Sequence, residues 1–220
     1  MNITDYVIIT DFDGTITNED SNTLLEKMFG NAKSAEIEAA YTRGEKGGRE
    51  TTEEHFKIIN ITQEEYYSFL DANIQVDPEF DAFLNLALSR NAHIYIVSGG
   101  YKQAIEHLLG KDRLTNVVIS ANELIEVGNY IKPKFAFDKV ECSEVYGSCG
   151  NCKRLVIESI RKAVSKKLIY IGDGLTDRCA IKCVDFVFAK DTLISYCEEQ
   201  NIPFKQFESF ADITKCFVEK

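Results

Sequence analysis

Short runs of apolar residues recur along the chain, separated by longer stretches with helical spacing. The short runs are rich in β-branched and aromatic residues and show little polar alternation, which is typical of strands buried on both faces of a parallel sheet. The stretches between them, such as 78–89, 101–109 and 153–164, carry the spacing of helices. Strands that alternate with helices predict an α/β fold with a doubly wound parallel sheet. The predicted strands are 3–10, 93–97, 116–119, 167–171 and 185–188.

The segment between the first strand and residue 78 has helical spacing and no convincing strand. It is too long for an idle loop. Helices are predicted at 19–29, 32–43, 52–58 and 63–70, with breaks at glycines. We interpret residues 17–77 as a small helical cap domain inserted into a core formed by 1–16 and 78–220. The alternative is that this segment belongs to one larger core.

A second irregular region covers residues 121–150. Within it, Gly128-Asn129 is flanked by apolar residues and predicts a hairpin turn. Further on, Cys142, Cys149 and Cys152 lie close together, and the last two have the spacing of a metal or redox pair. No nearby histidine offers a fourth zinc ligand, so reduced, packed thiols are the main expectation and a bound metal is the alternative.

Composition narrows the class of protein. With 220 residues and 45% apolar content, the chain can form one core domain with a smaller one attached. A formal net charge of -10 argues against a general binder of nucleic acid or anionic membranes. We see neither a signal peptide nor an apolar run of membrane-spanning length, so we expect a cytoplasmic protein with reduced cysteines. Monomer and homodimer both stay open.

The residues that can carry chemistry begin where the first predicted strand ends. Asp11 is the last strand residue and Asp13 lies in the turn, so both carboxylates can converge on one point. Two carboxylates so close repel each other unless a cation or a shared proton lies between them. Gly14 allows the backbone geometry that the turn needs. The alternative is that the two aspartates only cap a turn.

The second predicted strand ends at Ser98, which is followed by Gly99 and Gly100. A hydroxyl group and exposed main-chain N–H groups at the start of a helix can hold phosphate oxygens. Lys153 begins a later helix, from which its charge can reach a phosphoryl group and Asp11. Taken singly, the segment from Ser98 to Gly100 is also explained by an ordinary strand-to-helix turn. Lys153 is likewise explained by a solvated surface position.

The fourth predicted strand delivers two more acids, Asp173 and Asp177, to the same edge of the sheet. Asp173 is well placed to become a metal ligand. Asp177 is expected either to orient water around the ion or to pair with a lysine. A plain surface turn is the alternative for this Gly-Asp-Gly segment as well.

Taken together, these segments resemble the motif set of the haloacid dehalogenase superfamily, whose first motif is Asp-x-Asp-Gly-Thr. The resemblance implies a phosphatase with Asp11 as the nucleophile and Asp13 as the general acid and base. It implies that Ser98 binds phosphate and that Lys153 balances charge. It further implies a Mg²⁺ cofactor held by Asp11, Asp13 and Asp173, supported by Asp177, with Asp13 contributing its main-chain carbonyl oxygen. An aspartyl-phosphate intermediate follows from these roles.

The position of the helical segment resembles the phosphoserine-phosphatase-like branch of that superfamily. Residues 148–153 and 188–193 are similar to branch members of methionine salvage that dephosphorylate 2-hydroxy-3-keto-5-methylthiopentenyl-1-phosphate. The cysteine-bearing approach to Lys153 is also similar to phosphoethanolamine and phosphocholine phosphatases. The expected partner is therefore a small-molecule phosphomonoester, with the methylthiopentenyl ester first and phosphoserine, phosphoethanolamine or phosphocholine as alternatives.

Two other outcomes stay open. One is a regulatory protein that binds phosphate without turnover, although the intact acids and lysine argue against it. The other is phosphoryl transfer to a second sugar phosphate instead of water. Contacts to the leaving group are expected from the inserted segment, where Glu19, Arg43 and Arg49 are polar candidates, each with a solvated surface position as the simpler explanation.

Overall fold

A seven-stranded sheet forms the centre of the molecule in the computed structural model, which describes residues 1–141 and 147–218. The strand order is β4-β3-β2-β1-β7-β8-β9. Neighbouring strands are parallel except for the antiparallel pair β3 and β4. The predicted doubly wound α/β fold is confirmed. The strands are β1 (Tyr6–Thr10), β2 (His93–Tyr101), β3 (Val117–Val127), β4 (Tyr130–Lys134), β7 (Lys167–Gly172), β8 (Phe186–Ala189) and β9 (Lys205–Gln206).

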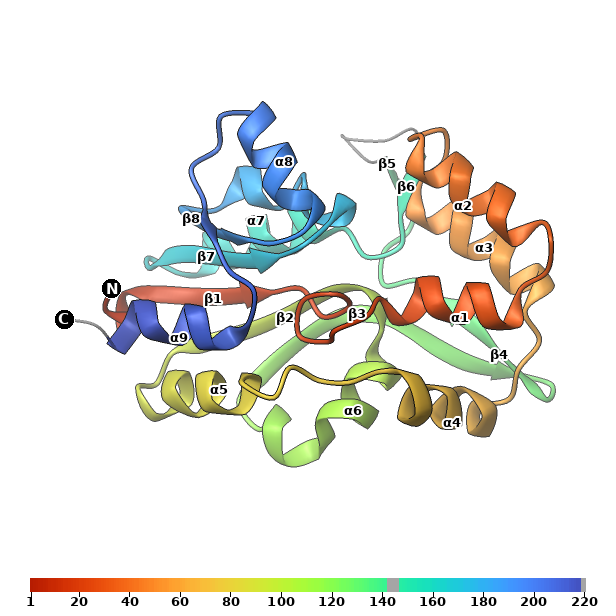
Figure 1. The fold of residues 1–220 in the computed structure, drawn as a ribbon, viewed down its shortest axis with the longest axis horizontal. Coiled ribbons are helices and arrows are strands. Elements are labelled where there is room, and N and C mark those ends of the chain that lie inside the picture. Colours follow the sequence, from red (N-terminus) through yellow and green to blue (C-terminus); the bar gives the residue numbers. More distant parts are fainter. Residues whose placement is uncertain (142–146, 219–220) are drawn as a thin grey trace.

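Helices cover both faces of this sheet (Figure 1). One face carries α5 (Phe80–Ser89), α6 (Lys102–Leu114) and α9 (Phe210–Val218), and the other carries α7 (Lys153–Ala163) and α8 (Thr192–Glu199). Side chains along β1 alternate between the two layers, because Ile8 packs with the first set of helices while Val7 and Ile9 pack with the second. A strand buried on both faces must be apolar throughout, which explains the absence of polar alternation in the sequence.

The first strand begins later than predicted. Residues Ile3–Asp5 form a 3-10 helix (η1), and β1 starts at Tyr6. The Asn2 side chain accepts a hydrogen bond from Thr4 N at 3.4 Å, and Asp5 N donates to Asn2 O at 3.2 Å. Short polar side chains of this kind favour a turn over an extended strand. The prediction of a strand from residue 3 was therefore wrong at its beginning.

The second strand continues further than predicted. It runs to Tyr101, with a shift in its register against β3 between Val97 and Tyr101. Ser98, Gly99 and Gly100 therefore lie in an irregular strand end instead of a loop. Such a bulge bends a strand and redirects its side chains. Glycine is required at position 100, because a Cβ atom there would collide with the Asp13 carboxylate.

The predicted hairpin is confirmed. Gly128, with a φ of +64°, lies in the turn between β3 and β4, and Val127 pairs with Tyr130. A small second sheet, β5 (Val140–Glu141) and β6 (Ser148–Cys149), follows the hairpin. In the cysteine-rich loop, Cys142 lies outside the described residues, and whether these cysteines hold a metal stays a prediction.

Four helices occupy the segment between β1 and α5, as predicted. They are α1 (Ser21–Phe29), α2 (Ser34–Thr42), α3 (Gly48–Ile58) and α4 (Gln63–Asn73), and α3 starts earlier than expected. In Figure 1, α1, α2 and α3 lie together at one end of the sheet, whereas α4 lies beside α6. One apolar cluster joins side chains from this segment, such as Leu25 and Phe69, to sheet residues such as Ile96. The boundary between core and cap stays a prediction.

The remaining short elements, η2 (Leu175–Asp177) and η3 (Ile181–Cys183), follow β7. Among the described residues, no helix combines the length and the apolar character needed to cross a membrane.

Candidate active site

A cavity of about 510 Å³ opens where β1, β2 and β7 end. Its opposite wall comes from α1, α2 and α3 of the inserted segment. Every residue of the predicted catalytic, phosphate and metal sites except Asp177 lines this cavity. Those residues are Asp11, Asp13, Ser98, Gly99, Gly100, Lys153 and Asp173.

Asp11 and Lys153 form a buried ion pair. Asp11 N donates to Ile171 O of β7 at 2.9 Å, so the carboxylate is anchored by the central sheet. Asp11 Oδ2 lies 2.6 Å from Lys153 Nζ, and the side chains are 7% and 2% exposed. Burial raises the pKa of Asp11 well above its usual range, although the Lys153 ammonium group opposes that shift. The sequence predicted that Lys153, at the start of a helix, would reach Asp11 at the end of a strand, and the structure contains this contact.

Asp177 lies behind this pair and binds the same lysine. Lys153 Nζ donates to Asp177 Oδ1 at 2.7 Å, and Tyr170 Oη donates to the same oxygen at 2.5 Å. The other oxygen accepts from Asp173 N at 2.9 Å and Gly174 N at 3.0 Å. Burial alone would raise the pKa of Asp177, but Lys153 and these donors hold it below its usual range. Of the two expectations for Asp177, pairing with a lysine is the one that the structure contains.

Asp13 faces a different set of groups. Its Oδ1 accepts hydrogen bonds from the Ser21 hydroxyl and from Ser21 N, and its Oδ2 accepts from Asn22 Nδ2 at 3.3 Å. Ser98 Oγ also lies 3.3 Å from Oδ2. Burial, followed by the charge of Asp20, raises the pKa of Asp13 to about 6. The two aspartates of the first motif therefore line one cavity but have separate partners.

Ser98 is held in place by its own strand end. Gly100 N donates to Ser98 Oγ at 2.9 Å, so this N–H group is already engaged and is not the open main-chain donor expected from the sequence. Asn151 Nδ2 donates to Ser98 O at 2.8 Å, and Asn122 Nδ2 donates to Gly99 O at 2.7 Å. The two amide side chains, Asn122 from β3 and Asn151 from the segment just before α7, thus fix the backbone of the strand end.

Asp173 approaches the first motif very closely. Thr15 Oγ1 donates to Asp173 Oδ1 at 2.5 Å. Gly14 has a φ of +74°, and a Cβ atom built on it would lie 2.6 Å from Asp173 Oδ2. Glycine is therefore needed at position 14 both for its backbone conformation and for the space it leaves to a carboxylate. Burial, followed by the Asp177 charge, raises the pKa of Asp173 to about 7.

Carboxylate oxygens of Asp11, Asp173 and Asp177 lie within 4.8 Å of one another. One ammonium group, that of Lys153, reaches this cluster through Asp11 and Asp177. Two buried carboxylates and the half-buried Asp173 beside one ammonium group leave an excess of negative charge, which a divalent cation would offset. Each Asp177 oxygen already accepts two hydrogen bonds, whereas each Asp11 oxygen has a single partner within the described chain, so Asp11 and Asp173 are the better placed metal ligands. All these donors are oxygen atoms, so the cluster could hold Mg²⁺.

Several contacts to the site residues were missed by the sequence analysis. Thr15 is part of the first motif, and its hydroxyl could have been noticed there. Ser21 and Asn22 could not be assigned, because their contact with Asp13 depends on how α1 returns to the sheet. Asn151 lies two residues before Lys153, and this proximity was the only feature of the sequence that pointed to it.

The cavity wall from the inserted segment is polar. The candidates named from the sequence, Glu19, Arg43 and Arg49, do not belong to it. Arg43 instead pairs with Glu45 at 2.7 Å near the surface. The side chains that do line this wall include Asp20, Asn22, Thr23, Glu26, Glu38, Tyr41, Thr42, Thr51 and Thr52.

Fold and site together define an α/β protein with a buried acidic centre at the carboxyl edge of a parallel sheet. The profile of the haloacid dehalogenase-like hydrolase family matches residues 8–182. The chain therefore belongs to this family. It is a hydrolase, a phosphatase of this family that acts on small phosphate substrates. The resemblance found in the sequence is confirmed.

Curated relatives extend along nearly the whole chain. A polyol phosphate phosphatase of Saccharomyces cerevisiae is 32% identical, over 94% of this chain and 90% of the relative. A 2-hydroxy-3-keto-5-methylthiopentenyl-1-phosphate phosphatase of Bacillus mycoides is also 32% identical, over 94% of this chain and 93% of the relative. Among solved structures, a phospho-aspartyl intermediate analogue of phosphoserine phosphatase has a TM-score of 0.70 and 18% identity, covering 96% of this chain and 97% of that chain. This last likeness concerns the fold.

Proposed function

We propose that the protein hydrolyses a small phosphomonoester through a phosphoryl group carried covalently by Asp11. The position of Asp11 supports this proposal most directly. Its carboxylate lines the cavity at the end of β1 and lies 2.6 Å from Lys153 Nζ. Attack by an Asp11 oxygen would form a bond to phosphorus and break the bond to the leaving oxygen, and water would then release phosphate.

Asp13 would act as the acid and then as the base. With a pKa raised to about 6 by burial and by the Asp20 charge, its carboxyl group can carry a proton close to neutral pH. It would give that proton to the leaving oxygen and later take one from the attacking water. The donors Ser21 and Asn22 would hold the carboxyl group in one orientation.

Phosphoryl oxygens would lie between Lys153 and the end of β2, formed by Ser98, Gly99 and Gly100. The hydrogen bond from Gly100 N fixes Ser98 Oγ beside the cavity, and Lys153 contributes a buried positive charge. The charge of the lysine is secured by the two aspartates that it contacts.

Asp11, Asp173 and the main-chain carbonyl of Asp13 would hold Mg²⁺, with Asp177 in a supporting position. When bound, the ion would offset the negative charge of the phosphoryl oxygens. The excess of carboxylates over ammonium groups in this cluster supports the assignment.

Two leaving groups are proposed. The methylthiopentenyl ester of methionine salvage is supported by the Bacillus mycoides relative and by residues 148–153 and 188–193. A polyol phosphate is supported by the Saccharomyces cerevisiae relative and by the cavity wall, where acids and threonines offer acceptors for several hydroxyl groups. Phosphoserine, phosphoethanolamine and phosphocholine remain in the same screen as further candidates.

The proposal is tested by measuring phosphate release from these esters in the presence of Mg²⁺, with Asp11→Asn as the critical variant. An amide cannot replace the carboxylate nucleophile, so we expect kcat to fall by at least about three orders of magnitude. Asp112→Asn, at an exposed position, is the matched control and should keep wild-type activity. Turnover that survives in Asp11→Asn would reject the nucleophile. Binding of these esters without phosphate release by the wild-type protein would favour the regulatory alternative.

A further inference from the structure

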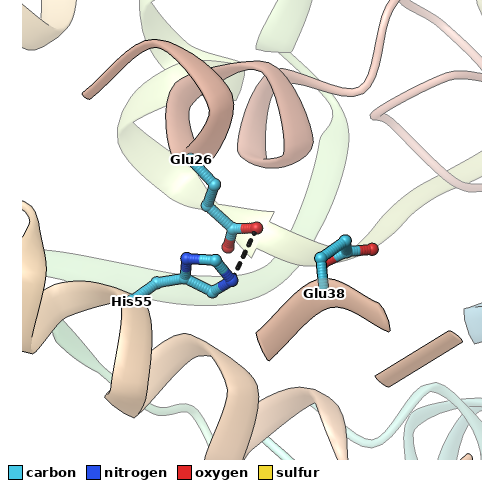
Figure 2. A group of neighbouring side chains, drawn as sticks. All are labelled: Glu26, Glu38 and His55. Carbon is cyan, nitrogen blue, oxygen red and sulfur yellow. Dashed lines mark ion pairs between the residues drawn. The ribbon is translucent and has the colours of Figure 1, made fainter. Parts of the chain in front are cut away.

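A second group of side chains with potential metal-ligand atoms lies among the inserted helices (Figure 2). Glu26 comes from α1, Glu38 from α2 and His55 from α3. One ligand atom of each residue lies within 4.8 Å of those of the other two. Three side chains that are far apart in the sequence thus meet at one point.

The histidine in this group is buried and poorly satisfied. His55 is 0% exposed, and in the described parts of the chain its Nδ1 has no hydrogen-bond partner. Its Nε2 lies 3.1 Å from Glu26 Oε2, yet the geometry there does not amount to a hydrogen bond. Buried ring nitrogens are normally hydrogen-bonded or bound to a metal. The Nε2 atom faces the Glu26 carboxylate, as Figure 2 shows.

The charge of the group is also unbalanced. Within residues 1–141 and 147–218, neither Glu26 nor Glu38 forms an ion pair with a lysine or an arginine, and Glu26 is only 12% exposed. Burial, followed by the Glu38 and Asp20 charges, raises the pKa of Glu26 to about 9. Burial lowers the pKa of His55, which keeps the imidazole neutral, the form that binds metals.

We propose that Glu26, Glu38 and His55 bind a divalent transition-metal ion of the zinc class. One imidazole nitrogen with two carboxylate oxygens is a donor set that suits Zn²⁺, Co²⁺ or Mn²⁺, whereas Mg²⁺ prefers oxygen donors alone. Bonds of about 2.1 Å in tetrahedral geometry would place the ligand atoms roughly 3.4 Å apart. The Nε2 atom of His55 and the Oε2 atom of Glu26, 3.1 Å apart, already lie close to that spacing.

Such an ion would have two consequences. It would join α1, α2 and α3, and a cross-link would replace the proton that the raised pKa keeps on Glu26. Three protein ligands would also leave a coordination position open, as in catalytic zinc sites. Because Glu26 and Glu38 line the cavity, that position would face the space in which the leaving group lies.

The site is tested by titrating Co²⁺ into the metal-free Asp173→Asn protein with Mg²⁺ in excess, so that the acidic centre does not take up the probe. We expect one equivalent of Co²⁺ with visible absorption bands of low-coordinate cobalt. Zn²⁺ should displace it, and elemental analysis should then find one zinc per chain. Because neither readout uses turnover, the outcome does not depend on the proposed reaction.

Glu38→Gln and His55→Asn, each made in the Asp173→Asn background, remove one ligand each and should weaken Co²⁺ binding by about 100-fold or more. The matched controls are Glu36→Gln, an exposed glutamate of the same helix, and His93→Gln, an exposed histidine. Both should bind like the parent protein. Circular dichroism checks folding, and Glu38→Gln is the safer variant because Glu38 is only half-buried.

Three results would overturn the proposal. The first is the absence of a bound equivalent in the parent protein. The second is unchanged affinity in a folded Glu38→Gln variant. The third is an intense thiolate-to-cobalt charge-transfer band, which would place the ion on cysteine instead.

Discussion

Asp11 and Asp13 are two residues apart, yet their surroundings give them different properties. Asp11 contacts the Lys153 ammonium group, whereas Asp13 accepts hydrogen bonds from Ser21 and Asn22, which are uncharged donors. Burial raises the pKa of Asp11, but the adjacent Lys153 ammonium group opposes that shift and favours the charged carboxylate that a nucleophile needs. A carboxyl group among neutral donors, with its pKa raised to about 6, can exchange a proton. The division of work proposed for the pair thus follows from the contacts of each side chain.

The buried carboxyl group of Glu26 should measurably change how the free energy of unfolding depends on pH. Burial and the nearby Glu38 and Asp20 charges raise its pKa from 4.5 to about 9. Between these values the folded chain keeps a proton that the unfolded chain has lost. The free energy of unfolding should therefore fall as pH rises from about 5 to 8, by up to about 1.4 kcal/mol per pH unit from this group.

The variant Glu26→Gln tests this prediction, because it is neutral at every pH. In denaturant titrations with a chelator, its stability relative to wild type should be higher at pH 8 than at pH 5.5. Asp13 and Asp173 titrate in both proteins, so the difference between the two profiles isolates Glu26. The exposed Glu36→Gln is the control and should follow wild type. Parallel profiles for Glu26→Gln and wild type would show that this group does not hold its proton.

The residues that could be predicted are those whose place follows from a strand end or a helix start. Asp11, Ser98 and Asp173 directly follow apolar runs, so the parallel sheet alone brings them to one edge. Glu26 and His55 could not be assigned in this way, since the contact between them depends on how α1 and α3 pack. No local pattern in the sequence records that packing.

At the scale of elements, α1 links the inserted segment to the site. Its N-cap is Asp20, which accepts hydrogen bonds from Asn22 N at 2.9 Å and Thr23 N at 2.8 Å. The first helical residues, Ser21 and Asn22, donate in turn to Asp13. The hydrogen bonds that cap α1 therefore also hold the donors of the Asp13 carboxyl group in place.

Replacing the cap in Asp20→Ala should lower the free energy of unfolding by about 1 kcal/mol. Because Ser21 and Asn22 lose their fixed position, kcat should fall as well. Thr62→Ala is the matched control, since Thr62 caps α4 through a capping box away from the cavity. It should lose similar stability and keep its kcat. The value of kcat is measured with the best substrate of the phosphate-release screen. Equal kcat in both variants would show that the start of α1 does not affect catalysis.

The first and last residues of an element were predicted well where the local sequence determines them. They were predicted less well where contacts with a neighbouring element determine them. Residues 116–119 were expected as a strand, but pairing with β4 extends β3 to Val127. The start of α3 at Gly48 was missed because glycine disfavours a helix interior. In the structure, Gly47 O accepts from Thr51 N at 3.1 Å and stabilises the first turn.

At the scale of the whole molecule, α3 is fastened to the region after β3 at separate points. Lys132 Nζ of β4 donates to Phe56 O at 2.6 Å. Arg49 Nη1 donates to Phe137 O at 2.9 Å. Glu50 accepts from Ser148 Oγ at 2.6 Å and from Ser148 N at 2.9 Å. If residues 17–77 form a cap that opens over the cavity, these contacts oppose its opening.

The Glu50 contact offers a direct test of that idea. In Glu50→Gln the side chain keeps its size, but its amide group cannot accept from both Ser148 donors. The loss should cost about 1 kcal/mol and make opening more frequent. We expect faster amide hydrogen exchange in α2 and α3, and a KM several times higher with a smaller change in kcat. Glu64→Gln, at an exposed position on α4, is the control. Faster exchange spread evenly over the sheet would instead indicate global destabilisation, and residues 17–77 would then not open as a unit.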